Sequence, residues 1–281
     1  MKIGVFGNCQ SVGMAASIRA LVPSAEVHHF GLHEARSAPT DKIAAEMDTF
    51  AKCDFVFLQP SLTHGINGLQ EPDFAARCKR IIPYPMIAYR GLQPDCHYIK
   101  LETGDLVQGA LGPYHSAIVA GAYQAGLCMD RAEKLFNVFT YRALGYFDIR
   151  ANSEPIGVES LRHQYDYSAF FDGERGVFMH TINHPTIGII FDSAKQALEK
   201  AQVHVNSSAT PPDDWLSTMH IWPVYTGLRS YSDAEIRFKS PRVSVDLSLS
   251  EFVKKATKPM NLPAPSSRRR RKRSKVSSTS L

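Results

Sequence analysis

Cys9 lies in the part of the chain whose residue types point most clearly to chemistry. Residues 5–11 read VFGNCQS, a pattern that predicts a buried strand turning into a helix with a thiol at the turn. In an open parallel sheet, ligands bind beyond the carboxyl ends of the strands. We expect Gly7 to permit the turn, the helix dipole to lower the thiol pKa, and Asn8 with nearby N–H groups to stabilise an oxyanion. A small buried cysteine in a Gly-Asn turn explains the same residues equally well.

His184 is the second candidate. It stands directly before Pro185, which holds it in an extended conformation, and just before a predicted long helix. An imidazole in that place can act as a general base, although a lone histidine is more often structural. His180 lies four residues earlier, but Pro185 argues against a helix that would bring both rings to one face. We therefore do not expect a metal pair here.

Alternating strands and helices must position these residues. The patterns predict strands at 2–6, 26–30, 54–58 and 85–89, and helices at 12–21, 40–52 and 72–82. Strands and helices that alternate at this spacing indicate an α/β fold with a parallel sheet. Arg90 follows the fourth predicted strand, so we expect it at the edge where ligands bind.

The pattern changes after residue 90. Helices are predicted at 116–127 and 130–144 and near 158–163, within a helical insert at about 105–165. A short apolar run at 176–182 precedes His184, and a helix at 186–201 follows it, with Ser193 and Lys195 expected to face solvent. We expect one α/β domain over 1–257 and a disordered tail over 258–281.

Composition excludes several classes of protein. The chain has 281 residues, of which 44% are hydrophobic and 21% charged, as in a globular protein. It lacks an apolar stretch of about 18 residues, the length that a membrane-spanning helix needs. The five cysteines are widely spaced without a CxxC pair, so we expect neither disulfides nor a zinc site, but a reducing cytoplasm. The N-terminus is too short and polar for a signal peptide.

The positive charge belongs to the tail. The formal net charge is +5, but seven cations lie within 268–275, and the rest of the chain carries −2. This distribution argues against a specific nucleic-acid binder. A solvated end is the simplest interpretation of the tail. Binding to an anionic membrane surface or non-specifically to nucleic acid are alternatives.

Two short motifs resemble those of SGNH (GDSL-like) hydrolases and acyltransferases. Gly7-Asn8-Cys9 stands where those enzymes carry Gly-Asp-Ser, and His184-Pro185 matches the end of their Asp-x-x-His-Pro motif, without the Asp. Gln59 follows the third strand, where they carry an oxyanion Asn. Gly-Asn-Cys-Gln after the first strand, with a late His-Pro, resembles the WcbI-type family of capsular polysaccharide biosynthesis proteins over roughly residues 1–205.

The resemblance implies an SGNH-like parallel sheet with an added helical portion, coenzyme A binding, and O-acetylation of a polysaccharide or activated sugar. The spacing of cysteines and histidines leads us to expect no metal. The resemblance also implies a cytoplasmic enzyme, and the basic tail would suit a place beside the inner membrane. Cys9 would be the nucleophile or acyl contact and His184 the base. The remaining candidates for the oxyanion or substrate are Asn8, Gln10, Ser11, Gln59 and Asn183. Ser11, two positions past the matching one, is a weaker candidate nucleophile.

Coenzyme A binding requires cations for its phosphates and an apolar slot for its pantetheine arm. Arg90, Gly7, Tyr114 and His115 are the candidates for this role. Three further cations, Arg77, Lys79 and Arg80, are more simply explained as the solvated face of a helix.

The residues leave the mechanism open. Cys9 can form an acetyl-thioester, or His184 can deprotonate a hydroxyl for direct attack on acetyl-CoA while Cys9 only lines the site. An esterase of the same fold and a non-catalytic binding protein are alternative functions. Among later residues, Asp213-Asp214 is more often a helix N-cap than a cation site. Trp215 and Trp222 are more often packing or rim residues than platforms for a sugar.

Overall fold

A four-stranded parallel sheet forms one end of the molecule. The computed structural model describes residues 1–60, 66–152, 164–171, 176–228 and 235–256. The strands are β1 (Lys2–Gly7), β2 (Glu26–Gly31), β3 (Phe55–Leu58) and β4 (Ile81–Pro83), in the order β2-β1-β3-β4. β1 pairs in parallel on both sides, with Phe6 opposite Phe30 of β2 and Leu58 of β3. The carboxyl ends of the strands therefore share one edge.

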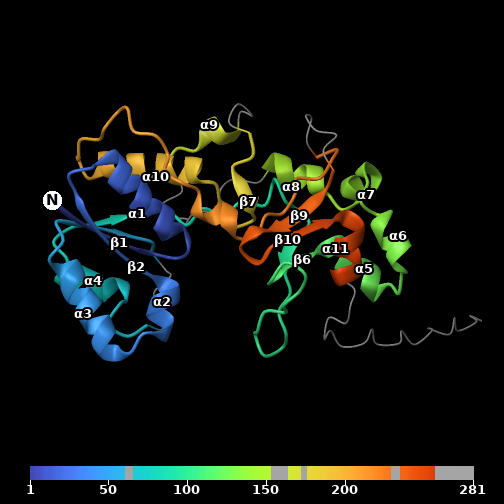
Figure 1. Cartoon of the computed structure of the whole chain (residues 1–281), viewed down its shortest axis with the longest axis horizontal. Coiled ribbons are helices and arrows are strands. Elements are labelled where there is room, and N and C mark those ends of the chain that lie inside the picture. Colours follow the sequence, from blue (N-terminus) through green and yellow to red (C-terminus); the bar gives the residue numbers. More distant parts are fainter. Residues whose placement is uncertain (61–65, 153–163, 172–175, 229–234, 257–281) are drawn as a thin grey trace, which may run out of the picture.

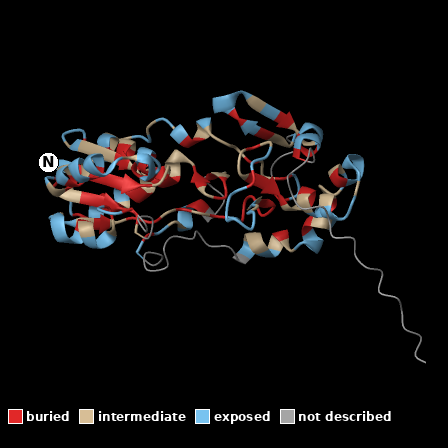
Figure 2. Cartoon of the chain, turned by 90° about the horizontal axis from the view of Figure 1, so that it is seen from below, coloured by how far each residue is buried: buried red, intermediate tan, exposed pale blue. Residues whose placement is uncertain are grey.

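Helices cover both faces of this sheet (Figure 1). One face carries α1 (Gln10–Leu21) and α10 (Ile187–Lys200); the other carries α2 (Leu32–Ser37), α3 (Thr40–Ala51) and α4 (Glu71–Arg77). Side chains alternate along β1, so Val5 packs with Met14 and Ala194 while Phe6 packs with Phe50 and Phe74. Figure 2 shows the strands buried between helices whose outer faces are exposed. This arrangement confirms the predicted α/β class with a parallel sheet flanked by helices.

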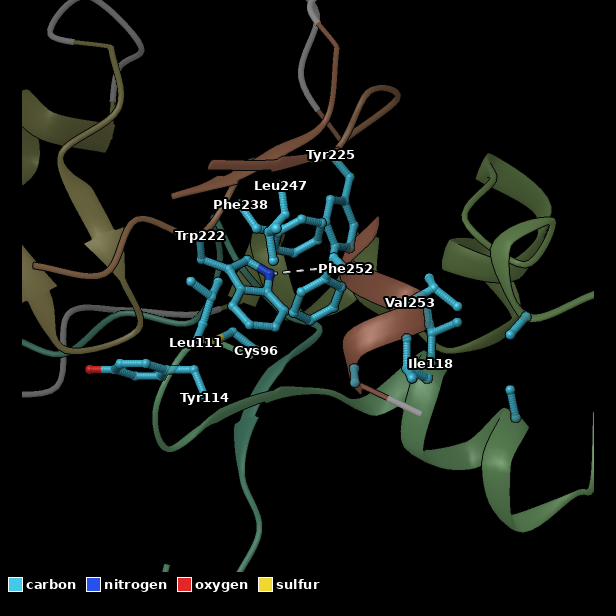
Figure 3. Packing of buried hydrophobic residues seen from close by; sticks show 14 of the residues in the cluster. Cys96, Leu111, Tyr114, Ile118, Trp222, Tyr225, Phe238, Leu247, Phe252 and Val253 are labelled. Carbon is cyan, nitrogen blue, oxygen red and sulfur yellow. Dashed lines mark hydrogen bonds between the residues drawn. The ribbon is translucent and has the colours of Figure 1, made fainter. Parts of the chain in front are cut away.

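A second core lies at the other end of the long axis. Its elements are β5 (Cys96–Tyr98), β6 (Tyr114–Ser116), α5 (Ala117–Gln124), α6 (Met129–Glu133), α7 (Val138–Ala143), α8 (Tyr146–Asn152), β9 (Arg237–Ser240), β10 (Val245–Ser248) and α11 (Leu249–Ala256). Trp222 is the centre of this core, with its ring edge-on to Phe238 at 5.0 Å and Phe252 at 5.3 Å. Its Nε1 donates to Tyr225 Oη over 3.2 Å (Figure 3). The predicted helices at 116–144 therefore pack against C-terminal elements.

Asp95 is a buried carboxylate inside this second core. It accepts hydrogen bonds from the hydroxyls of Tyr146 (2.7 Å) and Tyr225 (2.6 Å) and from the N–H of Ile118 in the first turn of α5 (2.9 Å). A buried charge is tolerated when its oxygens are hydrogen-bonded in this way. No local motif in the sequence points to Asp95.

A short segment around β7 (Met179–Thr181) and β8 (His184–Pro185) joins the two ends. Tyr89 N donates to Ile182 O over 2.8 Å, and Trp222 N donates to His180 O over 2.7 Å. The 3-10 helices η2 (Trp215–Thr218) and η3 (Pro241–Val243) and the short helix α9 (Ser168–Phe171) complete the described elements. The candidate residues 183 and 184 therefore lie where both halves meet.

Several predicted elements differ from the structure. The helix predicted over 72–82 ends at Arg77, because residues 81–83 form β4 at the edge of the sheet. The segment 85–89, predicted as the fourth strand, lies outside the four-stranded sheet, and Tyr89 N donates to Ile182 O instead. The helix predicted over 130–144 is two helices, because the Asn137 side chain caps a new one by accepting from Thr140 N (3.0 Å).

Ser193 does not face solvent. It is buried, donates to Ile189 O over 2.8 Å and lies 3.0 Å from the Tyr167 hydroxyl. The helical stretch predicted near 158–163 and the tail predicted to be disordered lie outside the described residues. Within the described ranges, no helix has the length and apolar character needed to span a membrane.

Candidate active site

The turn between β1 and α1 carries Cys9. Asn8 Oδ1 accepts from Gln10 N over 2.9 Å, and Asn8 N donates to Gln59 Oε1 over 2.8 Å. Asn8 therefore supplies the side-chain cap at the start of α1, while the Cys9 side chain makes no capping bond. Within the described part of the chain, the Asn8 side-chain NH₂ and the Cys9 N–H donate to no oxygen. These two groups remain available for an oxyanion.

The Cys9 thiol is half-buried, and its pKa is raised. Burial is the main cause, and the backbone N–H groups of Cys9 and Gln10 oppose it only in part. The expectation of a lowered pKa at a helix N-terminus is therefore wrong for this thiol. Desolvation outweighs the favourable helix end.

Gly7 is required for close packing and not for a special turn conformation. A Cβ atom at this position would lie 2.5 Å from Gln59 Oε1 and would also collide with the Tyr84 hydroxyl, and the φ angle of Gly7 is not positive. Gln59 is fully buried behind the turn, with its Nε2 directed at Pro85 O over 3.4 Å. Gln59 therefore holds Asn8 from behind, which does not fit the oxyanion role expected from the sequence.

Gln10 joins the turn to the His184 segment. Its Nε2 donates to Ile87 O (2.7 Å) and Asn183 O (3.0 Å), and its Oε1 accepts from Ile87 N (3.0 Å). Both Nε2 hydrogens are thus used inside the protein. Gln10 fixes the relation between Cys9 and Asn183 and does not fit the expected oxyanion role.

Ser11 is fully buried and hydrogen-bonded. Its Oγ donates to Asn8 O over 2.6 Å and lies 2.8 Å from His29 Nε2. Because a hydroxyl has one hydrogen, the short bond to Asn8 leaves Ser11 to accept from His29. This arrangement stabilises the Cys9 turn and gives Ser11 no base.

His184 is buried and uncharged at neutral pH. Burial, together with repulsion from His220 and His180, lowers its pKa to about 4. Its Nε2 lies 3.5 Å from Tyr114 Oη, and its Nδ1 is buried with no hydrogen-bond partner among the described residues. In the same part of the structure no carboxylate contacts the ring, so the acid missing from the sequence motif is not replaced here. No side-chain hydrogen bond joins His184 to Cys9 there either.

A histidine–carboxylate pair does exist nearby. His180 Nε2 lies 2.9 Å from Asp214 Oδ2, which also accepts from Ile187 N at the start of α10 (2.9 Å). Burial raises the pKa of Asp214, but His180 and these N–H donors outweigh it, and the net pKa is lowered. Asp214 also caps η2 through Ser217 N, as predicted for an N-cap.

Tyr114 is the polar centre of this region. Its hydroxyl donates to Asn183 Oδ1 over 2.7 Å, and its ring lies edge-on between His184 (5.8 Å) and His220 (5.6 Å). Tyr98 packs on the same ring at 5.2 Å. Figure 3 shows the Tyr114 hydroxyl pointing away from Trp222 and the second core. Tyr114 and Asn183 therefore lie together with His184, as expected for one site.

Comparison with known proteins identifies the family. The family described as polysaccharide biosynthesis enzyme WcbI matches residues 2–206. This chain belongs to the WcbI family. The structure also resembles a solved structure of WcbI, a polysaccharide biosynthesis enzyme, with a TM-score of 0.69 over 90% of this chain and 89% of the other at 14% identity. That structure is described as a native form without a disulfide between coenzyme A and one of its cysteines. No curated protein matches the chain.

The WcbI family match covers Cys9, Tyr114 and His184 but ends before two residues that complete the region. Asp214 and His220 lie beyond residue 206, whereas the structural similarity extends over most of the chain. From the sequence, His180 is weighed only as a metal ligand, and His220 belongs to a late candidate segment, 220–223, whose histidine has no predicted role. A late Asp after the His-Pro motif was the one available signal for the His180–Asp214 pair.

Two predicted coenzyme A contacts have surroundings that differ from those expected. His115 is buried, bonds to Val107 O over 2.9 Å and packs on Gly109, because adjacent residues of β6 point to opposite faces. It does not fit the ligand role expected from the sequence. Arg90 is exposed and contacts the His97 ring at 3.0 Å, at the end of a segment that is not a strand of the sheet. Its guanidinium remains accessible, but its expected position at a strand end is wrong.

Proposed function

We propose that this WcbI-family chain is a coenzyme A-dependent O-acyltransferase that moves an acetyl group to a hydroxyl of a polysaccharide or activated sugar. The observation that carries the proposal is the position of Cys9. Cys53 and Cys78 precede β3 and β4, Cys96 is in β5 and Cys128 is at the start of α6, so Cys9 alone lies at the carboxyl edge of the sheet. The related WcbI structure is described in terms of coenzyme A and a cysteine, and we place Cys9 beside the coenzyme A sulfur.

Direct attack is the route that the geometry favours. Cys9 has no base within hydrogen-bonding distance in the described structure, and its raised pKa keeps the thiol protonated at pH 7. His184 is neutral at that pH and able to accept a proton. In this route His184 removes the proton of the acceptor hydroxyl, the oxygen attacks the thioester carbonyl, and the C–S bond breaks. The proton then passes to the departing coenzyme A thiolate, giving an O-acetyl ester and free coenzyme A.

The oxyanion formed during attack needs hydrogen-bond donors. The free donors at the turn are the Asn8 side-chain amide and the Cys9 N–H, as described above. We place the enzyme in the cytoplasm, where acetyl-CoA and activated sugars are made. The basic run at 268–275 would hold it near an anionic inner membrane.

Calorimetry tests the proposal directly. We expect wild type and His184→Ala to bind coenzyme A and acetyl-CoA with micromolar or tighter affinity. Binding should persist at 300 mM salt, where capture of phosphates by the basic tail is screened. An absence of binding in both proteins would overturn the transferase assignment. Hydrolysis of simple acyl esters without coenzyme A would then favour an esterase of the same fold.

A further inference from the structure

We propose that Trp215 and Arg242 form the acceptor subsite, which binds a sugar ring that carries an anionic group, a carboxylate or a phosphate. This inference rests on the proposed transfer to a glycan and names the acceptor chemistry. The two tryptophans differ in exposure. Trp222 is buried at the centre of the second core, whereas Trp215 is 43% exposed.

The residue before Trp215 is bonded to the segments that carry the candidate site. Asp214, directly before Trp215, bonds to His180 and to Ile187 N at the first turn of α10. Ile187 in turn contacts Gly13, where an added Cβ would lie 3.2 Å from Ile187 Cδ1. Gly13 is about one helical turn after Cys9. Trp215 is therefore tied to the ends of α1 and α10 that face the candidate site.

The other end of the same segment is also tied to the site. The segment 214–220 ends at His220, whose ring packs on Tyr114 and lowers the pKa of His184. Between these ends, Leu216 is buried in the core beside α1, and Ser217 Oγ donates to Asp214 O over 2.6 Å. The ring of Trp215 thus projects from a fixed segment, which reduces the entropy lost when a ligand stacks on it.

Arg242 supplies the charge. Its guanidinium lies over the Trp215 ring, 5.9 Å from the ring centre, and its Nη1 lies 3.7 Å from Met219 Sδ. Within the described residues Arg242 forms no ion pair with a carboxylate. A partly exposed indole with an unpaired guanidinium over its ring fits a sugar ring that packs its C–H groups along the indole and carries an anionic substituent bound by bidentate hydrogen bonds from Arg242.

The test compares full-length variants. Wild type, Trp215→Ala, Trp215→Phe and Arg242→Gln are titrated with a trigalacturonate, with UDP-glucose and with neutral maltotriose at 200 mM salt. Calorimetry gives affinities, and tryptophan fluorescence reports the exposed Trp215 against the buried Trp222. The matched controls are Phe139→Ala and Arg142→Gln, which remove an exposed aromatic and an exposed arginine of α7.

We expect Trp215→Ala to weaken binding of a charged sugar at least tenfold and Trp215→Phe to retain most of it. Arg242→Gln should remove the preference for charged over neutral sugars. Preference for trigalacturonate indicates a uronic-acid acceptor, and preference for UDP-glucose indicates an activated sugar; either supports the subsite. Wild-type affinity in both Trp215→Ala and Arg242→Gln, or equal losses in the α7 controls, would overturn it.

Coenzyme A binding is measured on the same proteins. Binding of coenzyme A with no dependence of sugar binding on Trp215 overturns the subsite and leaves the transferase intact. Sugar binding that depends on Trp215 without coenzyme A binding supports the subsite and overturns the transferase.

Discussion

Gln10 Nε2 donates to the carbonyl oxygen of Asn183 over 3.0 Å, so the first turn of α1 is bonded to the residue that precedes His184. Cys9 and His184 each lie one residue from this bond. Their relation is set by a buried amide between backbone segments and not by a side-chain hydrogen bond. Each residue can therefore be replaced without removing a direct partner of the other.

His184→Ala should lower kcat for acetyl transfer at least ~100-fold, the usual scale for loss of a general base, while coenzyme A affinity stays within ~3-fold. In wild type the acidic limb of the pH–rate profile should fall near pH 4, because burial lowers the pKa of His184 to about 4. Steady-state kinetics between pH 4 and 8 check both. A limb near pH 6.5 would contradict the buried neutral state.

Stability should depend on pH through the same residue. The pKa of His184 in the folded protein lies below its value in the unfolded chain, so the unfolded chain binds more protons between pH 6.5 and 4. The free energy of unfolding therefore decreases as the pH is lowered through this range. The neutral ring of His184 costs no stability above pH 6.5. When the pH is lowered to 4.5, the free energy of unfolding decreases by on the order of 2–3 kcal/mol. Urea unfolding of wild type and His184→Asn at pH 7 and 4.5 measures it. Parallel losses in both proteins would argue against this assignment.

Alkylation of Cys9 should be slow at neutral pH. Burial raises the pKa of its thiol, so its reaction with iodoacetamide should increase only above about pH 8.5, the ordinary cysteine value. Mass spectrometry of the peptide that contains Cys9 follows the rate, and the exposed Cys128 provides an internal comparison. A midpoint below pH 7.5 would instead favour the acetyl-thioester route.

Ser11→Ala should retain acetyl transfer within ~3-fold, because Ser11 holds the turn and has no free base. It should lower the free energy of unfolding by about 1–2 kcal/mol, since Asn8 O and His29 each lose a buried partner. Turnover and urea midpoints measured on the same preparation separate the two effects. A loss of activity without a loss of stability would restore Ser11 as a nucleophile.

Gly7→Ala should destabilise the protein by about 1–3 kcal/mol, because the new methyl group would collide with Tyr84 and Gln59. Gly121→Ala is the matched control. Gly121 lies in α5 with open space around it, so alanine there should add about 0.5–1 kcal/mol of stability. Chemical denaturation of the two variants should give shifts of opposite sign.

Local patterns in the sequence predicted the elements that bury apolar runs. β1, α1 and α10 lie within two residues of their predicted bounds because each contributes several apolar side chains to one core. The strand expected at 85–89 was wrong because β4 is only three residues long and is stabilised by pairing with β3, a contact between distant segments. Periodicity does not contain that information.

The part of the candidate site that lies in one turn of the chain could be predicted from the sequence. The strand-to-helix motif places Cys9 and Asn8 together at that turn. The roles of Gln10 and Gln59 depend on which carbonyls surround them after folding, so their residue types alone suggested free donors. The His180–Asp214 pair joins residues from different segments, and the raised pKa of Cys9 depends on burial that only the packed structure reveals.

The segment that carries Asp214 and His220 also has a consequence for how the protein is handled. A fragment that stops where the family match ends, at residue 206, would keep Cys9 and His184 but lose the partner of His180 and the Trp222 centre of the second core. We expect such a fragment to expose apolar surface and aggregate. A fragment for expression, or for exchanging the site with that of a relative, should therefore end after α11, at Ala256 or beyond.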